Sequence, residues 1–475
     1  MFKFDISEFY SYRFRYIIGY FLFVIGLISV LIFVGLYLPG GLSNQEMQSV
    51  IRSDSINHNS IWSTNVINLP YHLLQKVSLA LFGVSILSIK LPSIILAFLS
   101  AIGMLIILRK WFKPRIGVLA SLIAITTGQF LFIAQNGTPE VLYLFWPICL
   151  IFIASHLPCP PKYKYICSVL LFSTIALSLY TPLSVYILLA IIGATLFHPH
   201  LRYLFKQLSR PKLIFGSVFF LIIITPLIIS VIMKPSLLLT LLGIPDHWPN
   251  LSANIKSLGI QYLGFTNPNN TTLMTPFFEL GSMLIIAIGI FNTIRTIETA
   301  KSYILAFWTV CLLPVILFNP DFTSITFLPL VILLASGLSY LLSYWYDLFP
   351  RNPYARVGGL IPLVILVSVL IFSGIDRYIH GYRYDPNLSS SFSNDLKLIP
   401  KDTKELVVSS DESSFYSVYT RHRTGIILSE SPTGDEFLAS RKAKKNYAGY
   451  SIKRIITTSS INDADRFYLY KKIAN

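Results

Sequence analysis

The sequence predicts an all-α protein that crosses a membrane many times and carries a small α/β or α+β domain at its C-terminal end. Of the 475 residues, 54% are hydrophobic and only 13% are charged, with a mean hydropathy of +0.63. Such a chain has too little polar side chain to cover a soluble globule. Its apolar residues also gather in runs of about 20, the length that a helix needs to cross a bilayer.

We interpret eleven apolar segments as membrane-spanning helices. The first is too long for the core of a signal peptide and is followed by no small-residue cleavage pattern, so we expect it to be retained. In chain order, the segments are 16–38, 86–108, 116–134, 140–157, 165–181, 183–198, 213–233, 277–294, 302–318, 323–343 and 357–374. With the loops between them they form a predicted membrane domain over residues 1–375.

Lysine and arginine predict the orientation, because cationic loops stay on the cytoplasmic side. With the N-terminus inside, the inner segments hold 17 Lys and Arg, whereas the outer loops before the C-terminal domain hold 5. An odd number of crossings of the plasma membrane then places the C-terminal domain outside. Much of the net charge of +16 reflects this bias, so we predict no binding of nucleic acid.

Residues 376–475 differ in composition from the rest, with 16 Lys and Arg and 12 Asp and Glu. Its apolar runs are short, as in "ELVVSS", "GIILSE", "SIKRIITTSS" and "RFYLYKKI", which favours a small α/β or α+β domain. The stretch "GDEFLASRKAKKNYAG" predicts a helix, since its acids stand at the start and its bases toward the end. We expect a small extracytoplasmic domain, either a cap packed on the helices or a recognition module.

Acidic residues at the outer face are few, which limits where acid–base chemistry can occur. Outside the C-terminal domain and the cytoplasmic segments, the sequence leaves Glu46, Asp54, Glu140, Asp246, Glu279 and Asp321. Ionisable groups near the bilayer are costly and are candidates for function. The first outer loop, 39–85, is longer than a plain connection requires and contains two of these acids. It is therefore the first place to expect a site.

A second long outer loop covers residues 234–276. Its apolar first part is expected to lie along the membrane, and Asp246-His247-Trp248 stands at a turn between prolines. Lys256 follows in the same loop, so this region also offers polar groups for binding. The sequence contains no Cys-x-x-Cys pair and no His-x-x-x-His pair, so it indicates no metal site.

The region after the first outer loop resembles GT-C membrane glycosyltransferases of the protein O-mannosyltransferase and aminoarabinose-transferase type. The shared features are Pro70 before an interfacial helix, then Leu81-Phe82-Gly83, Lys90 and Leu91-Pro92-Ser93. Downstream, Pro139-Glu140 stands where the family often has an acidic residue after a proline. The likeness covers about residues 1–160 and is only topological over 160–375.

The resemblance implies a polyprenyl-phosphate-linked sugar as donor, a site bordered by membrane lipid, and a glycan, lipid or protein as acceptor. An acidic residue would activate the acceptor hydroxyl, and the catalytic candidates are Glu46, Asp54 and Glu140. The candidates for binding the donor phosphate or its lipid are Arg52, His58, His72, Lys76, His247 and Lys256. No cofactor is predicted, and a divalent metal is not indicated.

The sequence departs from the family at the usual Asp-Glu pair, which is Gln45-Glu46 here. Gln cannot take a proton at neutral pH, so we expect Glu46 to be the base, with Glu140 holding the acceptor or tuning the charge. Two alternatives stay open. Ser43 followed by Glu46 is also a capping box, which would give Glu46 a structural role alone. The chain could instead be a catalytically silent scaffold that binds or transports a lipid-linked glycan.

Overall fold

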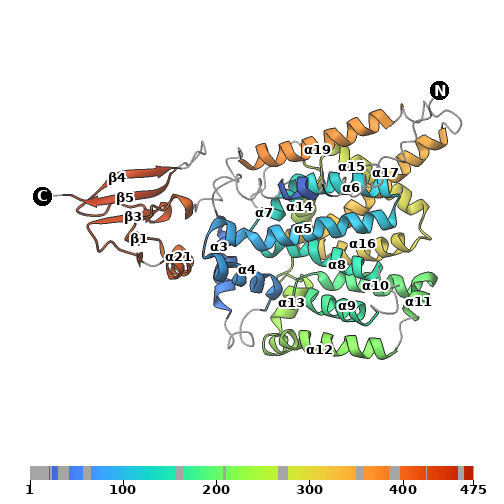
Figure 1. Cartoon of the computed structure of the whole chain (residues 1–475), viewed down its shortest axis with the longest axis horizontal. Coiled ribbons are helices and arrows are strands. Elements are labelled where there is room, and N and C mark those ends of the chain that lie inside the picture. Colours follow the sequence, from blue (N-terminus) through green and yellow to red (C-terminus); the bar gives the residue numbers. More distant parts are fainter. Residues whose placement is uncertain are drawn as a thin grey trace, which may run out of the picture.

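The computed structural model has a long helical bundle with a small sheet domain at one end (Figure 1). The residues that it describes are 21, 24–29, 42–56, 66–155, 164–206, 210–245, 247–265, 276–348, 358, 360–383, 396–423, 425–457 and 465–473. The predicted helix 16–38 therefore lies mostly outside the described residues. His58 and Asp246 also lie outside them.

Apolar helices form the bundle, and shorter helices close its two ends. The apolar helices are α5 (Ile86–Trp111), α6 (Pro114–Thr126), α7 (Gly128–Gln135), α8 (Leu142–Ser155), α9 (Lys164–Ser178), α10 (Ser184–Phe197), α12 (Arg210–Met233), α15 (Leu280–Arg295), α16 (Ala300–Phe318), α17 (Phe327–Leu348) and α19 (Leu360–Arg383). The shorter ones are α3 (Asn44–Ser55), α4 (Leu69–Phe82), η2 (Pro139–Val141), α11 (Pro199–Lys206), α13 (Ser236–Leu242), α14 (Leu251–Leu263) and η4 (Pro320–Thr326).

Most of the predicted membrane helices are present. Among the described residues, five helices are long and apolar enough to cross a bilayer, and the pair α6 and α7, bent by 62°, makes a sixth. Four shorter apolar helices, 139–155, 165–178, 184–197 and 280–295, coincide with four further predicted segments. The polytopic helical class is thus confirmed, whereas the total of eleven crossings remains a prediction.

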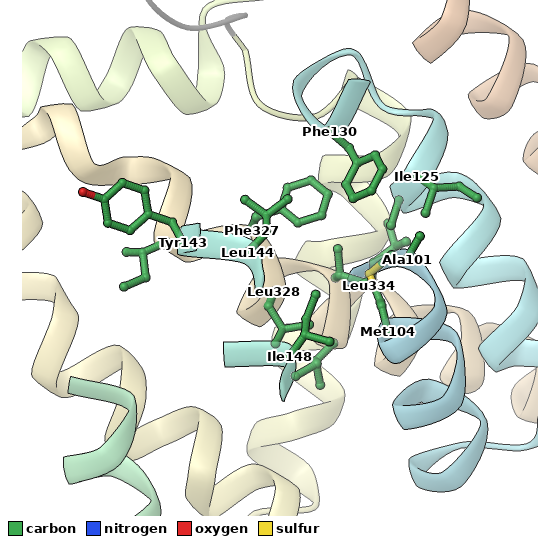
Figure 2. Packing of buried hydrophobic residues seen from close by; sticks show 14 of the residues in the cluster. Ala101, Met104, Ile125, Phe130, Tyr143, Leu144, Ile148, Phe327, Leu328 and Leu334 are labelled. Atoms are coloured by element: carbon green, nitrogen blue, oxygen red, sulfur yellow. The ribbon is translucent and has the colours of Figure 1, made fainter. Parts of the chain in front are cut away.

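The core of the bundle lies where α5, α6, α7, α8 and α17 meet (Figure 2). The ring of Phe327 of α17 is stacked on that of Phe278, with centroids 5.5 Å apart, and is tilted against that of Phe130 of α7, at 5.9 Å. Figure 2 also shows Met104 of α5 and Ile148 of α8 in this cluster. Burial of these side chains fixes the end of α7 and the start of α8, and the polar residues 136–140 lie between them.

Glycine lets two helices, α15 and α17, approach at their backbones. A Cβ on Gly289 would meet the carbonyl oxygen of Leu333, and one on Gly337 would meet that of Ile285. Such close approach of small residues gives packing within a membrane, where lipid removes the hydrophobic drive between helices. Gly374 of α19 has the same role against Thr126, at the break between α6 and α7.

The C-terminal region contains a five-stranded sheet in the order β2-β1-β3-β5-β4. Its elements are η5 (Leu396–Leu398), β1 (Glu405–Val407), α21 (Ser410–His422), β2 (Ile427–Ser429), β3 (Glu436–Ser440), η6 (Arg441–Ala443), β4 (Tyr450–Thr457) and β5 (Asp465–Lys472). Strand β1 pairs in parallel with β2 and β3, and β5 pairs antiparallel with β3 and β4. The predicted α/β or α+β class of this region is confirmed, and each of the four short apolar runs contains a strand.

The helix predicted over "GDEFLASRKAKKNYAG" is wrong. Glu436–Ser440 forms the central strand β3, and only Arg441–Ala443 makes a helical turn. Phe437, Leu438 and Ala439 are all buried, because both faces of this strand are covered. Such a strand shows a continuous apolar run and not alternation, and this pattern cannot be told from a buried helix by periodicity.

The sheet domain is packed on α3 and α4 at one end of the bundle (Figure 1). Met47 and Val50 of α3 and Leu79 of α4 share one buried apolar cluster with Tyr416 and Tyr419 of α21. Helix α5 begins beside this cluster and ends far from it, whereas α19 runs the opposite way toward the sheet. Helices α3 and α4, which belong to the predicted loop 39–85, therefore lie between the bundle and the sheet domain.

Candidate active site

Glu46 lies in the first turn of α3 and is completely buried. Its backbone N–H donates to Ser43 Oγ at 3.2 Å, and its Oε2 accepts from the backbone N–H of Ser43 at 2.9 Å. The capping box expected from the sequence is therefore present, and both partners satisfy groups that a helix start leaves open.

The other oxygen of Glu46 faces residues that are distant in the sequence. Its Oε1 accepts from the backbone N–H of Gly137 at 2.8 Å and lies 3.5 Å from the ammonium of Lys90. Lys90 Nζ also donates to Gln135 Oε1 at 3.0 Å, and both side chains of the ion pair have 0% exposure. The pair joins α3, α5 and the turn of residues 136–138 between α7 and η2.

A second polar network joins α3 to α4. Gln75 Oε1 accepts hydrogen bonds from the hydroxyls of Ser49 and Ser53, at 2.8 and 2.7 Å. Its amide Nε2 donates to the carbonyl oxygens of Ile89 and Gly137, both at 3.1 Å. These side chains are buried, so the network fixes α4 and the turn 136–138 relative to one another.

Glu140 follows this turn, in the short helix η2. Its Oε2 is buried without a hydrogen-bond partner, as are Asn136 Oδ1 and Thr138 Oγ1 in the turn itself. Buried polar atoms are usually paired, so three unpaired oxygens on one short segment are unusual. Each of these three oxygens can accept a hydrogen bond.

Tyr71 lies near both carboxylates. Its hydroxyl is hydrogen-bonded to Ser93 Oγ at 2.8 Å, and Ser93 in turn donates to the carbonyl of Thr138 at 3.4 Å. Burial raises the pKa of Tyr71, and the nearby charges of Glu46 and Glu140 raise it further. Two of the three predicted catalytic residues, Glu46 and Glu140, therefore lie near one tyrosine, beside the first part of α5.

His72 and Lys76 lie on α4 and are held by the chain near the end of α3. His72 Nδ1 is hydrogen-bonded to Ser53 Oγ at 2.9 Å, whereas its Nε2 is buried without a partner. Burial, followed by the charge of Arg52, lowers the pKa of His72 to about 4. Lys76 Nζ donates to the carbonyl oxygen of Ile56.

The remaining predicted residues lie apart from the buried network. Asp54 forms an ion pair of 3.0 Å with Arg421 of the sheet domain. His247 precedes α14 and Lys256 lies on it, and both side chains are exposed. The sequence therefore predicted a single group of residues, which the fold separates into a buried network and a more open periphery.

Two members of the network, Lys90 and Gln75, were not among the predicted site residues. A signal for Lys90 existed, because it is the only charged residue in the apolar run 86–108. Gln75 gave no such signal, since a glutamine on an interfacial helix is ordinary. Its role depends on contacts with Gly137, which is 62 positions away in the sequence.

Comparisons with known proteins agree with this architecture. Residues 70–229 match the family model described as dolichyl-phosphate-mannose-protein mannosyltransferase. The fold is similar to that of ArnT from Cupriavidus metallidurans in the apo state, at 12% identity and a TM-score of 0.53, covering 96% of this chain and 98% of that one. The structure of that ArnT bound to undecaprenyl phosphate has 12% identity, a TM-score of 0.50 and the same coverage of 96% and 98%. No protein of curated function matches the sequence.

These likenesses confirm the resemblance to GT-C membrane glycosyltransferases and show that this chain has their fold. They extend beyond the first 160 residues, where the sequence alone carried the resemblance, to nearly the whole chain, including the sheet domain. Together with the apolar helices, they identify a multi-pass membrane protein.

Proposed function

We propose that the protein transfers a sugar from a polyprenyl-phosphate-linked donor to an acceptor at the outer face of the membrane. The observation that carries this proposal is that segment 136–140 has three buried oxygens without a hydrogen-bond partner, one of them on the carboxylate of Glu140. The carboxylate of Glu46 is hydrogen-bonded to the same segment, at Gly137. Sugars and their acceptors are rich in hydroxyl groups that can pair with such oxygens. The fold shared with ArnT supports the choice of donor, because one ArnT structure contains undecaprenyl phosphate.

Glu140 is the better placed base of the two buried carboxylates. The oxygens of Glu46 already accept from Ser43 and Gly137 and lie beside Lys90, so little capacity remains for a substrate proton. Glu140 keeps one oxygen without a partner. This reverses the order expected from the sequence, in which Glu46 was the base and Glu140 the helper.

The reaction follows from these roles. An acceptor hydroxyl attacks the anomeric carbon of the donor sugar, and its proton passes to Glu140. The bond between that carbon and the phosphate oxygen breaks, and polyprenyl phosphate leaves with the electron pair. Arg52 of α3 and Lys76 of α4 are the cations that could offset the phosphate charge. His72 Nε2 could accept a hydrogen bond, because Ser53 donates its proton to Gln75 and the proton of neutral His72 is then on Nδ1.

A silent scaffold is the second candidate function. It is favoured by Gln45, which replaces the usual acid of the family, and by Glu46, which is sealed inside the protein. On this account the chain would bind a polyprenyl-phosphate glycan without cleaving it. Binding and turnover separate the two accounts, so both must be measured on the same preparation.

The test uses the purified full chain in detergent with synthetic undecaprenyl-phosphate sugars carrying a hexose or a pentose, and with a heat-treated extract of cell-envelope lipids and glycans as the source of acceptor hydroxyls. Release of undecaprenyl phosphate is followed by mass spectrometry, and binding of undecaprenyl phosphate by the rise in melting temperature. We expect binding and turnover, with the Michaelis constant for donor raised in Arg52→Met and Lys76→Met. Lys453→Met, at an exposed lysine of the sheet domain, is the control. Binding without turnover would favour the silent scaffold. Absence of both binding and turnover would reject both accounts.

A further inference from the structure

We propose that Glu46, Lys90 and Gln75 are positioning residues that hold the peptide group of Gly137, and thereby set the place of Glu140. The inference rests on the proposed function, because it gives these residues a purpose in the same reaction. It assigns no contact with substrate to any of them. Their effect passes through the turn 136–138.

Both polar atoms of Gly137 are held by buried side chains from the first outer loop. Its N–H donates to Glu46 Oε1 at 2.8 Å, and its carbonyl oxygen accepts from Gln75 Nε2 at 3.1 Å. A side chain at this position would also have no room, because a Cβ would lie 2.8 Å from Ile89 Cγ2 and 3.2 Å from Glu46 Oε1. The peptide is therefore fixed in place and in orientation.

Two features carry this fixed position to Glu140. The carbonyl of Thr138 accepts from Ser93, so the next peptide is also attached to α5. Pro139 follows, and its ring restricts the backbone φ angle. Only Thr138 and Pro139 separate Gly137 from Glu140, so little freedom remains between the held peptide and the carboxylate.

Lys90 explains how a carboxylate can serve as the anchor. A buried carboxylate without a cation would take up a proton or draw in water, since the interior penalises an unpaired charge. The ammonium of Lys90 lies 3.5 Å from Glu46 and is itself held by Gln135. The charge pair thus keeps Glu46 as an acceptor for the Gly137 N–H.

A double-mutant cycle separates positioning from chemistry. Lys90→Met leaves the buried carboxylate of Glu46 without its cation, and Glu46→Gln leaves the buried ammonium of Lys90 without its anion. The double variant contains neither buried charge. The glutamine at position 46 still has a carbonyl oxygen that can accept from the Gly137 N–H. Replacing both members of a buried ion pair is often tolerated, whereas removing one is not. Lys301→Met, at a half-buried lysine on α16, is the matched control.

Three quantities are measured for each variant: the melting temperature, hydrogen exchange of the peptide spanning 134–141, and donor turnover. In each single variant we expect exchange in this peptide to be about tenfold faster and kcat to be about 10²-fold lower, with the donor KM nearly unchanged, as misplacement of a reacting group can cause. In the double variant exchange should return to within about twofold of the wild type, and kcat to within about tenfold.

Two results would overturn the inference. One is normal exchange and normal kcat in folded Lys90→Met. The other is a double variant whose exchange is normal but whose kcat stays as low as in the single variants, since the charge of Glu46 would then act in the chemistry. Exchange requires no turnover, so the cycle still decides whether the pair holds the turn if the proposed reaction fails.

Discussion

At the scale of single residues, His72 makes stability depend on pH. Burial and the charge of Arg52 lower its pKa to about 4 in the folded protein, below the ordinary 6.5. The unfolded chain therefore binds a proton at a higher pH than the folded chain does. Stability should be full above pH 6.5 and fall as the pH drops toward 4, by about 3 kcal/mol if this group acts alone.

The measurement compares melting temperatures at pH 7.5 and pH 5 for the wild type and His72→Asn. The variant should lose less stability between the two pH values, because the group that takes up the proton is gone. His200→Asn, at an exposed histidine of α11, serves as the control. An equal loss in the wild type and His72→Asn would show that His72 does not cause the dependence.

The local part of the site could be predicted from the sequence, and the distant part could not. Ser43 and Glu46 are three positions apart, so their capping box follows from helix geometry. The partners Lys90 and Gly137 are 44 and 91 positions from Glu46, and only the fold brings them together. The same holds for Asp54, a candidate base in the sequence, which the fold pairs with Arg421 of the sheet domain.

At the scale of elements, the contact between α15 and α17 depends on glycine. Gly337→Ala should destabilise the protein by about 1–3 kcal/mol, because its Cβ would meet the backbone of Ile285 and force the helices apart. Gly259→Ala on α14 is the control, since a Cβ there meets nothing within 4 Å. The control should be neutral or slightly stabilising, by up to about 1 kcal/mol. An equal loss of melting temperature in detergent for Gly337→Ala and Gly259→Ala would contradict this prediction.

Helices were easier to predict than the sheet domain for a physical reason. A membrane helix is marked by a long apolar run, and this signal needs no knowledge of its neighbours. Strand β3 carries a short apolar run whose burial depends on β1 and β5 on either side. The helix α21 (Ser410–His422) was missed because its sequence is polar and its apolar face is narrow.

At the scale of the whole molecule, the sheet domain and the first outer loop should lie on the outer side of the membrane. The expectation rests on the distribution of Lys and Arg, and on the attachment of the sheet domain to α3 and α4. After replacement of the four native cysteines, Lys453→Cys should react with an impermeant thiol reagent in intact cells. Lys113→Cys, exposed before α6, should not react. The reverse pattern would place the site on the cytoplasmic side.

More of the general architecture than of the site could be predicted from the sequence. Composition and apolar runs predict a polytopic membrane protein, and the match of fold extends over 96% of this chain. The choice of base could not be predicted in this way, because it depends on which carboxylate oxygen is left without a partner. Glu46 and Glu140 look alike in the sequence and differ only in their surroundings.

Donor turnover by Glu140→Gln tests the central claim most directly. The change keeps the size of the side chain and removes its ability to take the acceptor proton. Measured with undecaprenyl-phosphate sugar beside the wild type, the variant should melt normally, bind undecaprenyl phosphate normally and turn over about 10²–10⁴-fold more slowly, the typical cost of losing a general base. Turnover by folded Glu140→Gln at the wild-type rate would contradict the assignment of Glu140 as the base.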